Sequence, residues 1–177
     1  MSSAPESIRL EDWIRDIPDF PQKDILFKDI TPLLQDGVAF RAALDRLAAH
    51  YVGAGIQTVV GVESRGFIFG APLAYLLGCG FVPVRKFGKL PAETVNVEYE
   101  LEYGTNIVEI HTDAIRPGER VLIVDDLLAT GGTVSATIEL VEKLGGYIAG
   151  IAFLVELSFL KGREHLKGND VFALIKY

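Results

Sequence analysis

The chain has 177 residues, 49% of them hydrophobic, and a formal net charge of −7 at pH 7. This length and composition indicate one folded domain with a sizeable core, and they exclude a disordered chain. The excess of acidic residues argues against a general nucleic-acid-binding surface. We therefore expect no nucleic-acid partner.

Two features bear on the compartment in which the protein works. The only cysteine, Cys79, cannot form a disulfide within the chain, which favours a reducing compartment. The first residues include Glu6 and Arg9 and lack an apolar core, so no signal peptide is visible. Residues 67–84 carry no charge, but glycines and prolines interrupt them, which favours a buried helix and strand over a membrane span. We expect a cytoplasmic protein with no membrane partner.

The predicted elements begin with a weakly amphipathic helix over Ile8–Ile17, which prolines end. A short extended piece is expected over residues 25–30. The next helix should start at Asp36 or Gly37, because apolar side chains recur along one face. These side chains are Phe40, Ala43, Leu44, Leu47 and Tyr51.

The middle and end of the chain alternate buried strands with helices, which predicts a parallel sheet covered on both faces. The expected strands are Thr58–Val62, Phe81–Arg85, Val121–Val124 and Ile148–Val155. One expected helix follows Glu63–Gly66 and runs to about Leu77, a second spans Ser135–Leu144, and a short one spans Ser158–Leu166. The segment Val171–Tyr177 should lie at a sheet edge. Ligands bind outside the carboxyl ends of such strands. The segments expected at that edge are Glu63–Gly66, Arg85–Lys86 and Asp125–Thr133.

Between Phe87 and Thr112 the pattern changes to a period of two, which predicts an extended arm with one polar face. Apolar residues from Val95 to Tyr103 alternate there with polar residues, namely Asn96, Glu98, Glu100 and Glu102. Asn106–His111 should pair back on this arm through a turn at Gly104.

The stretch Val121–Thr133, V-L-I-V-D-D-L-L-A-T-G-G-T, combines a buried strand, two acidic residues, a glycine loop and a helix start. Glycines let backbone N–H groups turn towards a ligand, and a helix N-terminus adds positive partial charge. Asp125 and Asp126 repel each other and need donors nearby. A ribose 5-phosphate suits both the glycine loop and the aspartate pair, because its phosphate can bind the loop while its hydroxyls donate to the carboxylates. A Gly-Gly pair can also form an ordinary turn with Thr133 as a helix cap, but the four parts together favour a ligand site.

This assembled stretch resembles the phosphoribosyl diphosphate (PRPP) signature of the type I phosphoribosyltransferases. Displacing the diphosphate of PRPP builds negative charge, which cations must meet. Arg65 is one candidate, and Arg85, Lys86 and Lys89 form a second basic group, which could also be a solvated cluster. Mg²⁺ would bridge diphosphate and ribose oxygens and should arrive with the substrate, since no all-protein metal cage is visible.

Further motifs narrow the family and run in one order: F-P-D-F-P, L-F-K-D-I-T-P, E-S-R-G-F-I-F-G, R-K-F-G-K-L-P, L-E-Y-G and V-E-L-S-F-L-K-G-R. Together they resemble the adenine phosphoribosyltransferases from about Trp13 to the C-terminus. The resemblance implies an α/β fold with a Rossmann-like parallel sheet flanked by helices, in a single domain over 1–177. It also implies a small hood over about 1–34 and a flexible hairpin loop over about 87–112.

The resemblance implies the purine-salvage reaction of adenine with PRPP, giving AMP and diphosphate, in an enzyme that forms a homodimer. It places Glu102, Arg65, Asp125 and Asp126 in catalysis. The implied substrate-binding residues are Ala129, Thr130, Gly131, Gly132 and Thr133 for the 5-phosphate, Phe27, Lys28 and Leu127 around the base, Arg85, Lys86 and Lys89 for the diphosphate, and Tyr103, which would help to exclude water. Arg85 would act across the dimer interface, and Lys28 replaces an arginine common in some relatives.

Other interpretations stay open at this point. A PRPP-sensing regulator could share the fold, although the negative charge argues against a nucleic-acid surface. A methyltransferase-like nucleotide binder would explain an acidic residue at a strand end, but neither T-G-G-T nor the basic groups. Within the favoured class, hypoxanthine or xanthine could be the base. The three histidines are scattered and show neither metal-ligand nor triad spacing.

Overall fold

The computed structural model describes residues 8–100 and 104–177. The chain forms two compact units, Met1–Arg46 and Leu47–Tyr177, and their boundary falls inside helix α2 (Gly37–Tyr51). The expected single domain with a hood over about 1–34 stays a prediction. Among the described residues, no helix is long and apolar enough to cross a membrane. The cytoplasmic location also stays a prediction.

The N-terminal unit contains a two-stranded antiparallel sheet followed by helices. Its elements are η1 (Leu10–Trp13), β1 (Arg15–Ile17), β2 (Phe27–Asp29), α1 (Thr31–Gln35) and most of α2. The predicted helix over Ile8–Ile17 is wrong beyond a single 3₁₀ turn. Residues 15–17 pair with residues 27–29 instead, and Nη2 of Arg15 lies 2.6 Å from Oδ2 of Asp29.

Helix α2 begins at Gly37, as the sequence predicts, because Asp36 caps it. Its Oδ1 atom accepts hydrogen bonds from the backbone N–H groups of Val38 at 3.0 Å and Ala39 at 2.8 Å. Four of the five predicted stripe residues are buried, and Phe40 is half-buried.

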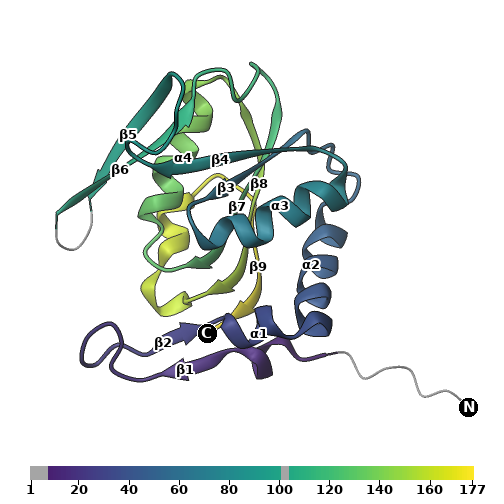
Figure 1. Ribbon diagram of the computed structural model, residues 1–177, viewed down its shortest axis with the longest axis vertical. Helices are drawn as coiled ribbons and strands as arrows, with labels where there is room; N and C mark the ends of the chain where they lie inside the picture. Colours follow the sequence, from purple (N-terminus) through teal and green to yellow (C-terminus); the bar gives the residue numbers. More distant parts are fainter. Residues whose placement is uncertain (1–7, 101–103) are drawn as a thin grey trace, which may run out of the picture. The chain divides into compact units, whose positions relative to one another are not determined.

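The C-terminal unit is built on a seven-stranded sheet in the order β5-β6-β4-β3-β7-β8-β9 (Figure 1). Five adjacent strands run parallel to one another, namely β4, β3, β7, β8 and β9. The hairpin of β5 and β6 is antiparallel and joins this sheet at one edge, where β6 pairs with β4. The strands are β3 (Thr58–Val62), β4 (Gly80–Lys86), β5 (Thr94–Glu100), β6 (Thr105–His111), β7 (Arg120–Leu128), β8 (Tyr147–Glu156) and β9 (Val171–Lys176). The expected α/β sheet is therefore confirmed, with the predicted hairpin added to it as edge strands.

Helices α3 (Arg65–Leu77) and α4 (Gly132–Lys143) cover opposite faces of this sheet. Gly61 of β3 faces Gly70 of α3, where a Cβ on Gly70 would lie 3.4 Å from the Cα of Gly61. Its neighbour Val60 packs instead in the buried cluster that contains Leu140 of α4. Successive side chains of a strand point to opposite faces, so the two helices sandwich the sheet.

Strand β7 is longer than the predicted Val121–Val124, because its pairing with β8 continues to Leu128 opposite Glu156. Asp125 and Asp126 therefore lie inside the last part of the strand and not after it. The predicted short helix over Ser158–Leu166 is a pair of 3₁₀ turns, η2 (Ser158–Leu160) and η3 (Gly162–Leu166). Strand β9 lies at the sheet edge, as predicted.

Candidate active site

The loop Ala129–Thr133 joins β7 to α4, and its conformation requires glycine. Gly131 has a φ of +88°, a left-handed value that favours glycine. A Cβ at this position would lie 2.7 Å from the carbonyl oxygen of Gly162, so the backbone at 162 packs directly against the loop. The first N–H groups of an α-helix have no acceptor within the helix. The start of α4 at Gly132 therefore offers donors to an anion.

Arg65 and Asp126 form an ion pair between the first turn of α3 and the end of β7. The Nε atom of Arg65 lies 2.5 Å from Oδ2 of Asp126. The carboxylate side chain is 7% exposed, whereas the guanidinium side chain is 49% exposed. Arg65 thus supplies the positive charge that the acidic pair needs, and it also faces solvent at the mouth of the site.

The carboxyl group of Asp125, next to Asp126 on β7, is in an environment that disfavours its charged form. Burial raises the pKa of Asp125 well above its ordinary value of 3.8, and the negative charge of Asp126 raises it further. Its Oδ1 atom accepts the backbone N–H of Asp126 at 2.9 Å. A Cβ on Gly66 would lie 2.9 Å from the same oxygen, so the small residue lets α3 approach the carboxylate closely.

A cavity of about 330 Å³ opens at the carboxyl ends of β3 and β7. Its volume is at the lower end of those typical of ligand pockets. The lining residues come from two segments that lie far apart in the sequence, one after β3 and one at the end of β7 and the loop that follows it: Glu63, Ser64, Arg65, Asp125, Asp126, Leu127, Ala129 and Thr133. The cavity therefore joins the predicted phosphate loop, both aspartates and the predicted cation Arg65.

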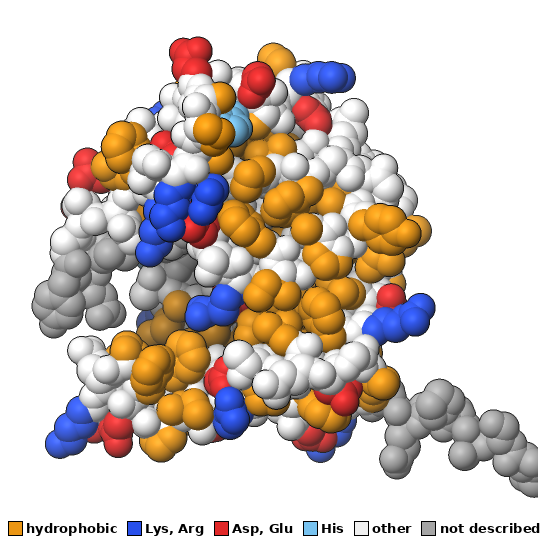
Figure 2. Space-filling view, in the orientation of Figure 1, with side chains coloured by type: hydrophobic (Ala, Val, Ile, Leu, Met, Phe, Trp, Pro, Cys, Tyr) orange, Lys and Arg blue, Asp and Glu red, His pale blue; other side chains and the backbone are white. Residues whose placement is uncertain are grey.

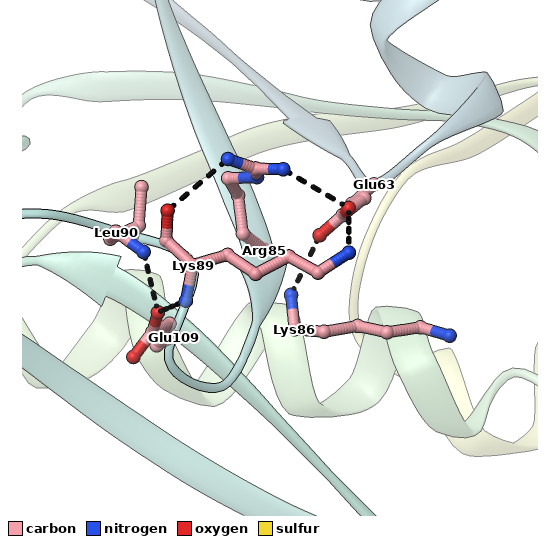
Figure 3. A network of polar contacts seen from close by, with 6 residues as sticks. All are labelled: Glu63, Arg85, Lys86, Lys89, Leu90 and Glu109. Atoms are coloured by element: carbon pink, nitrogen blue, oxygen red, sulfur yellow. Dashed lines mark hydrogen bonds and ion pairs between the residues drawn. The ribbon is translucent and has the colours of Figure 1, made fainter.

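Glu63, which lines this cavity, contacts all three residues of the second predicted basic group (Figure 3). Its Oε1 atom accepts from Nη2 of Arg85 at 3.2 Å and from Nζ of Lys89 at 2.8 Å, and Oε2 accepts from the backbone N–H of Lys86 at 2.9 Å. Figure 3 shows the side chain of Lys86 extending away from Glu63. The three basic residues are thus held together by one carboxylate.

A second buried carboxylate, that of Glu109, fixes the turn after β4. Its Oε1 atom accepts from the backbone N–H groups of Lys89 and Leu90, each at 2.9 Å (Figure 3). Burial alone would raise the pKa values of Glu63 and Glu109. Hydrogen bonds outweigh burial in both cases, and the pKa of Glu63 falls to about 2 while that of Glu109 is also lowered. Both carboxylates are therefore ionised at neutral pH.

A second cavity, of about 240 Å³, adjoins the first, since Glu63 and Thr133 line both. The remaining lining residues are Val62, Val84, Lys86, Tyr99, Asn106 and Val108. Within it, Oγ1 of Thr133 donates a hydrogen bond to the hydroxyl of Tyr99 at 3.1 Å. The Lys86 side chain, which extends away from Glu63, contributes the basic group of this cavity.

The predicted site residues fall into three groups. Those on the phosphate loop, on β7 and around Glu63 lie at one sheet edge of the C-terminal unit, as expected. Phe27 and Lys28 lie on β2 of the N-terminal unit, where the Phe27 ring meets Phe20 at a centroid distance of 5.1 Å and Lys28 Nζ lies 2.7 Å from Asp16 Oδ1. Their role in base binding stays a prediction. Glu102 and Tyr103 lie outside the described residues.

Sequence reasoning assigned no role to Glu63, Glu109 or Tyr99. A signal was present for the first two, because each acidic residue directly adjoins a run of buried apolar positions. Glu109 is 2% exposed between Val108 and Ile110, which is a rare place for an unpaired charge. For Tyr99 the alternating pattern indicated only the apolar face of the arm, and nothing in it pointed to Thr133.

Among residues 8–100 and 104–177, no group of three or more His, Cys, Asp or Glu side chains is placed to hold a metal ion. The hard oxygen donors that line the larger cavity are the carboxylates of Glu63, Asp125 and Asp126. Glu63 and Asp126 are already engaged with basic side chains. The donors in this part of the chain therefore suit a cation that brings most of its own ligands.

Comparisons with known proteins agree with this geometry. The family model of the phosphoribosyl transferase domain matches residues 33–172. The chain is 59% identical over 169 residues to the adenine phosphoribosyltransferase of Halothermothrix orenii, covering 96% of this chain and 99% of that protein. The chain belongs to the adenine phosphoribosyltransferase family.

Solved structures of other family members share the fold. The adenine phosphoribosyltransferase of Thermoanaerobacter pseudethanolicus is 58% identical and superposes with a TM-score of 0.92, covering 96% of this chain and 100% of that one. The Saccharomyces cerevisiae enzyme, crystallised with an imino-altritol bisphosphate and adenine, is 45% identical with a TM-score of 0.90, covering 93% of this chain and 96% of that one. The similarity therefore extends over nearly the whole chain.

Proposed function

We propose that the protein transfers the 5-phosphoribosyl group from PRPP to adenine, giving AMP and diphosphate in purine salvage. The observation that carries this proposal is the cavity in which a glycine phosphate loop, two aspartates and Arg65 meet. Membership of the adenine phosphoribosyltransferase family and the adenine in the yeast relative's structure support the choice of base.

The ribose 5-phosphate part of PRPP fits the larger cavity. Backbone N–H groups of Ala129–Thr133 and the Thr133 hydroxyl donate to the 5-phosphate, where several charge-assisted hydrogen bonds outweigh the helix dipole. The 2- and 3-hydroxyls of the ribose donate to Asp125 and Asp126. These contacts hold C1 of the ribose at a fixed place, so the base can attack without a further search for orientation.

Cations at the edge of the cavity meet the charge that develops on the leaving diphosphate. Arg65 has the position for this role, because half of its side chain faces solvent while its Nε atom is anchored by Asp126. Lys86 and Lys89 supply further charge in the same site, and Arg85 supplies it across the dimer interface. Glu63 holds the side chains of Arg85 and Lys89 and the backbone N–H of Lys86 at fixed positions, which lowers the cost of orienting the two long side chains that it contacts.

Mg²⁺ that arrives with PRPP would supply positive charge to the leaving diphosphate. The described donors fit a cation that arrives with its substrate, since Glu63 and Asp126 already serve basic side chains. Asp125 is the carboxylate whose pKa a nearby cation would bring down again.

The base would lie at the end of β7, where Leu127 lines the cavity directly after Asp126. An apolar wall of this kind suits a purine ring. We assign Phe27 and Lys28 of the N-terminal unit to the same base, Glu102 to proton transfer on it, and Tyr103 to the exclusion of water. These four assignments rest on the resemblance to the family.

The active assembly is a homodimer, in which Arg85 reaches the partner's diphosphate. Helix α3 supports this assignment, because it exposes a line of large apolar side chains at Ile68, Tyr75 and Leu76, the second of them 85% exposed. Hydrophobic side chains gather over α3 in Figure 2. Such a face favours burial against a second copy. Light scattering after chromatography should give a dimer that Tyr75→Glu weakens, and a monomeric wild type would reject this assembly.

A panel of free bases tests the proposed reaction. Each base is mixed with PRPP, Mg²⁺ and the protein, and nucleotide and diphosphate are measured separately. Adenine should give both products in equal amounts. If the pocket hydrogen-bonds the exocyclic amine, hypoxanthine should react about 10⁴-fold less efficiently, because its oxygen leaves buried groups unpaired. Equal turnover of the two bases would reject the adenine assignment, and no nucleotide from any base would reject the transferase.

A further inference from the structure

Tyr99 of β5 covers the first turn of α4 from the side of the hairpin. A Cβ on Gly132 would lie 3.5 Å from Cδ2 of the Tyr99 ring, which is ordinary van der Waals contact. The hydroxyl at the end of the same ring accepts the hydrogen bond from Oγ1 of Thr133 at 3.1 Å. The ring itself is held in place because it packs against the buried cluster of the C-terminal unit.

Thr133 lines both cavities. Tyr99 lines the smaller cavity together with Lys86 and Asn106, and the described lining of the larger cavity contains Thr133 without Tyr99. Tyr99 therefore contacts Thr133 in the smaller cavity and is absent from the described lining of the larger one, which Thr133 shares with Asp125 and Arg65.

A threonine hydroxyl has one proton to donate and two lone pairs that accept. When Oγ1 of Thr133 donates that proton to a phosphate oxygen, it cannot also donate to Tyr99. The tyrosine hydroxyl can then turn its own proton towards Oγ1 of Thr133. The result is a chain from Tyr99 through Thr133 to the phosphate, in which each hydrogen bond strengthens the next.

We propose that Tyr99 is a positioning residue for the 5-phosphate: its hydroxyl orients that of Thr133 so that Thr133 donates to the phosphate. This inference rests on the proposed function, because it takes the loop Ala129–Thr133 as the phosphate site. Tyr99 does not touch the substrate in this arrangement. It acts through Thr133 and thereby selects ligands that carry a 5-phosphate.

The variant Tyr99→Phe tests the proposal, because it keeps the ring over Gly132 and deletes only the hydroxyl. Loss of one hydrogen bond in the chain should raise the KM for PRPP and the Kd for ribose 5-phosphate about five- to tenfold. The KM for adenine and kcat should stay within about twofold, since only binding of the phosphate is weakened. The matched control is Tyr147→Phe on β8, whose exposed ring faces Arg120; all constants should stay at wild-type values.

A double-mutant cycle with Thr133 separates this role from a structural one. Thr133→Val removes the hydroxyl that Tyr99 orients, so adding Tyr99→Phe should cause no further loss of ribose 5-phosphate affinity. Thr133→Ser retains the hydroxyl and should remain sensitive to Tyr99→Phe.

Two results would overturn the proposal in distinguishable ways. If Thr133→Val binds PRPP like wild type, the Thr133 hydroxyl does not bind the phosphate and the role of Tyr99 fails, while the backbone N–H groups of the loop still account for the phosphate site. If Thr133→Val weakens binding but Tyr99→Phe does not, or if the two losses add fully, the site stands and Tyr99 has no positioning role. A lower Tm of Tyr99→Phe with unchanged affinity would likewise assign the hydroxyl to stability alone.

Discussion

Nε of Arg65 and Oδ2 of Asp126 lie 2.5 Å apart and join the start of α3 to the end of β7 across the candidate site. The pair is asymmetric, because the carboxylate is almost fully buried and the guanidinium is half exposed. One contact therefore serves both stability and chemistry: the buried carboxylate needs the cation, and the exposed part of the cation remains able to meet an anion.

Arg65→Ala should lower both stability and activity. It leaves the buried Asp126 carboxylate without this partner, which should cost roughly 1–3 kcal/mol in the free energy of unfolding, and it removes a charge that faces the diphosphate, which should lower kcat about 10²- to 10³-fold. Urea denaturation and initial rates measure the two effects. The control Arg41→Ala removes an exposed pair on α2 and should change neither. If Arg65→Ala has the wild-type free energy of unfolding and the wild-type kcat, both roles are contradicted.

The two aspartates should respond differently to amide substitution. Asp125→Asn removes a carboxylate whose charge is disfavoured by burial and by Asp126, so stability at neutral pH should stay equal or rise. Asp126→Asn breaks the pair with Arg65 and should reduce stability. Each variant should weaken PRPP binding or turnover by roughly 1.5–3 kcal/mol, since a charged hydrogen bond to a ribose hydroxyl is lost. Unchanged kinetics in both variants would reject the role of the pair in binding the ribose.

The ionisation of Asp125 makes the free energy of unfolding depend on pH, and the direction of this dependence follows from its raised pKa. Its pKa in the folded state is raised above the ordinary value, so the folded state binds this proton more tightly than the unfolded state. Its contribution to stability is therefore fully present below about pH 3.8 and is lost as the pH rises through the folded-state pKa.

The Glu63 cluster should make stability depend on pH in the opposite sense. Its pKa falls from the ordinary value of 4.5 to about 2, so the stabilisation is full above pH 4.5 and disappears as the pH falls towards 2. Glu63→Gln should unfold more easily than wild type at pH 7 and approach wild-type stability near pH 2. Urea denaturation at a series of pH values measures this difference. A difference that does not change between pH 7 and pH 2.5 would show that Glu63 contributes through packing and not through charge.

Local patterns account for the parts of the fold that were predicted correctly. Thr58–Val62 is a strand with the predicted bounds because all five residues are buried, and α2 starts at Gly37 because Asp36 caps it within three residues. The strand Arg15–Ile17 was missed because its partner, Phe27–Asp29, begins ten residues after it ends. The weak apolar periodicity of one segment contains no information about pairing with a segment elsewhere in the chain.

The candidate site shows the same division between local and distant interactions. The loop, the aspartates and the individual basic residues are visible as short motifs. The contacts that organise them join residues far apart in sequence, with a separation of 61 for Arg65 and Asp126, 34 for Thr133 and Tyr99, and 26 for Lys89 and Glu63. These contacts follow from strand order and register, which single-sequence periodicity does not contain.

The resemblance to the family assigns Glu102 to proton transfer, and two other glutamates of the arm provide matched controls. Glu98 and Glu100 are exposed on β5, on the polar face that the alternating pattern predicts for the arm. Glu102→Gln should lower kcat about 10²- to 10⁴-fold if the carboxylate exchanges a proton with the adenine ring. Glu98→Gln and Glu100→Gln should change kcat little. If all three variants stay within a few-fold of wild type, charge and positioning carry the reaction without Glu102.

The backbone at Gly162, where η3 begins, packs against the phosphate loop from outside. A Cβ on Gly162 would lie 2.3 Å from the carbonyl oxygen of Ala129, so Gly162→Ala must displace backbone at the loop itself. The displacement should cost about 1–3 kcal/mol in the free energy of unfolding.

Gly162→Ala should weaken the binding of PRPP more than that of adenine, because the donors to the 5-phosphate move together with Ala129. We expect the KM for PRPP to rise at least tenfold, since a shift of about 1 Å can cost 10²-fold in rate, while the KM for adenine changes less. The control Gly37→Ala adds a Cβ at a position with open space around it and should behave as wild type in both assays. If Gly162→Ala loses stability but keeps its KM for PRPP, the loop adapts to the displacement, and the packing of Gly162 against Ala129 supports the fold without setting the phosphate site.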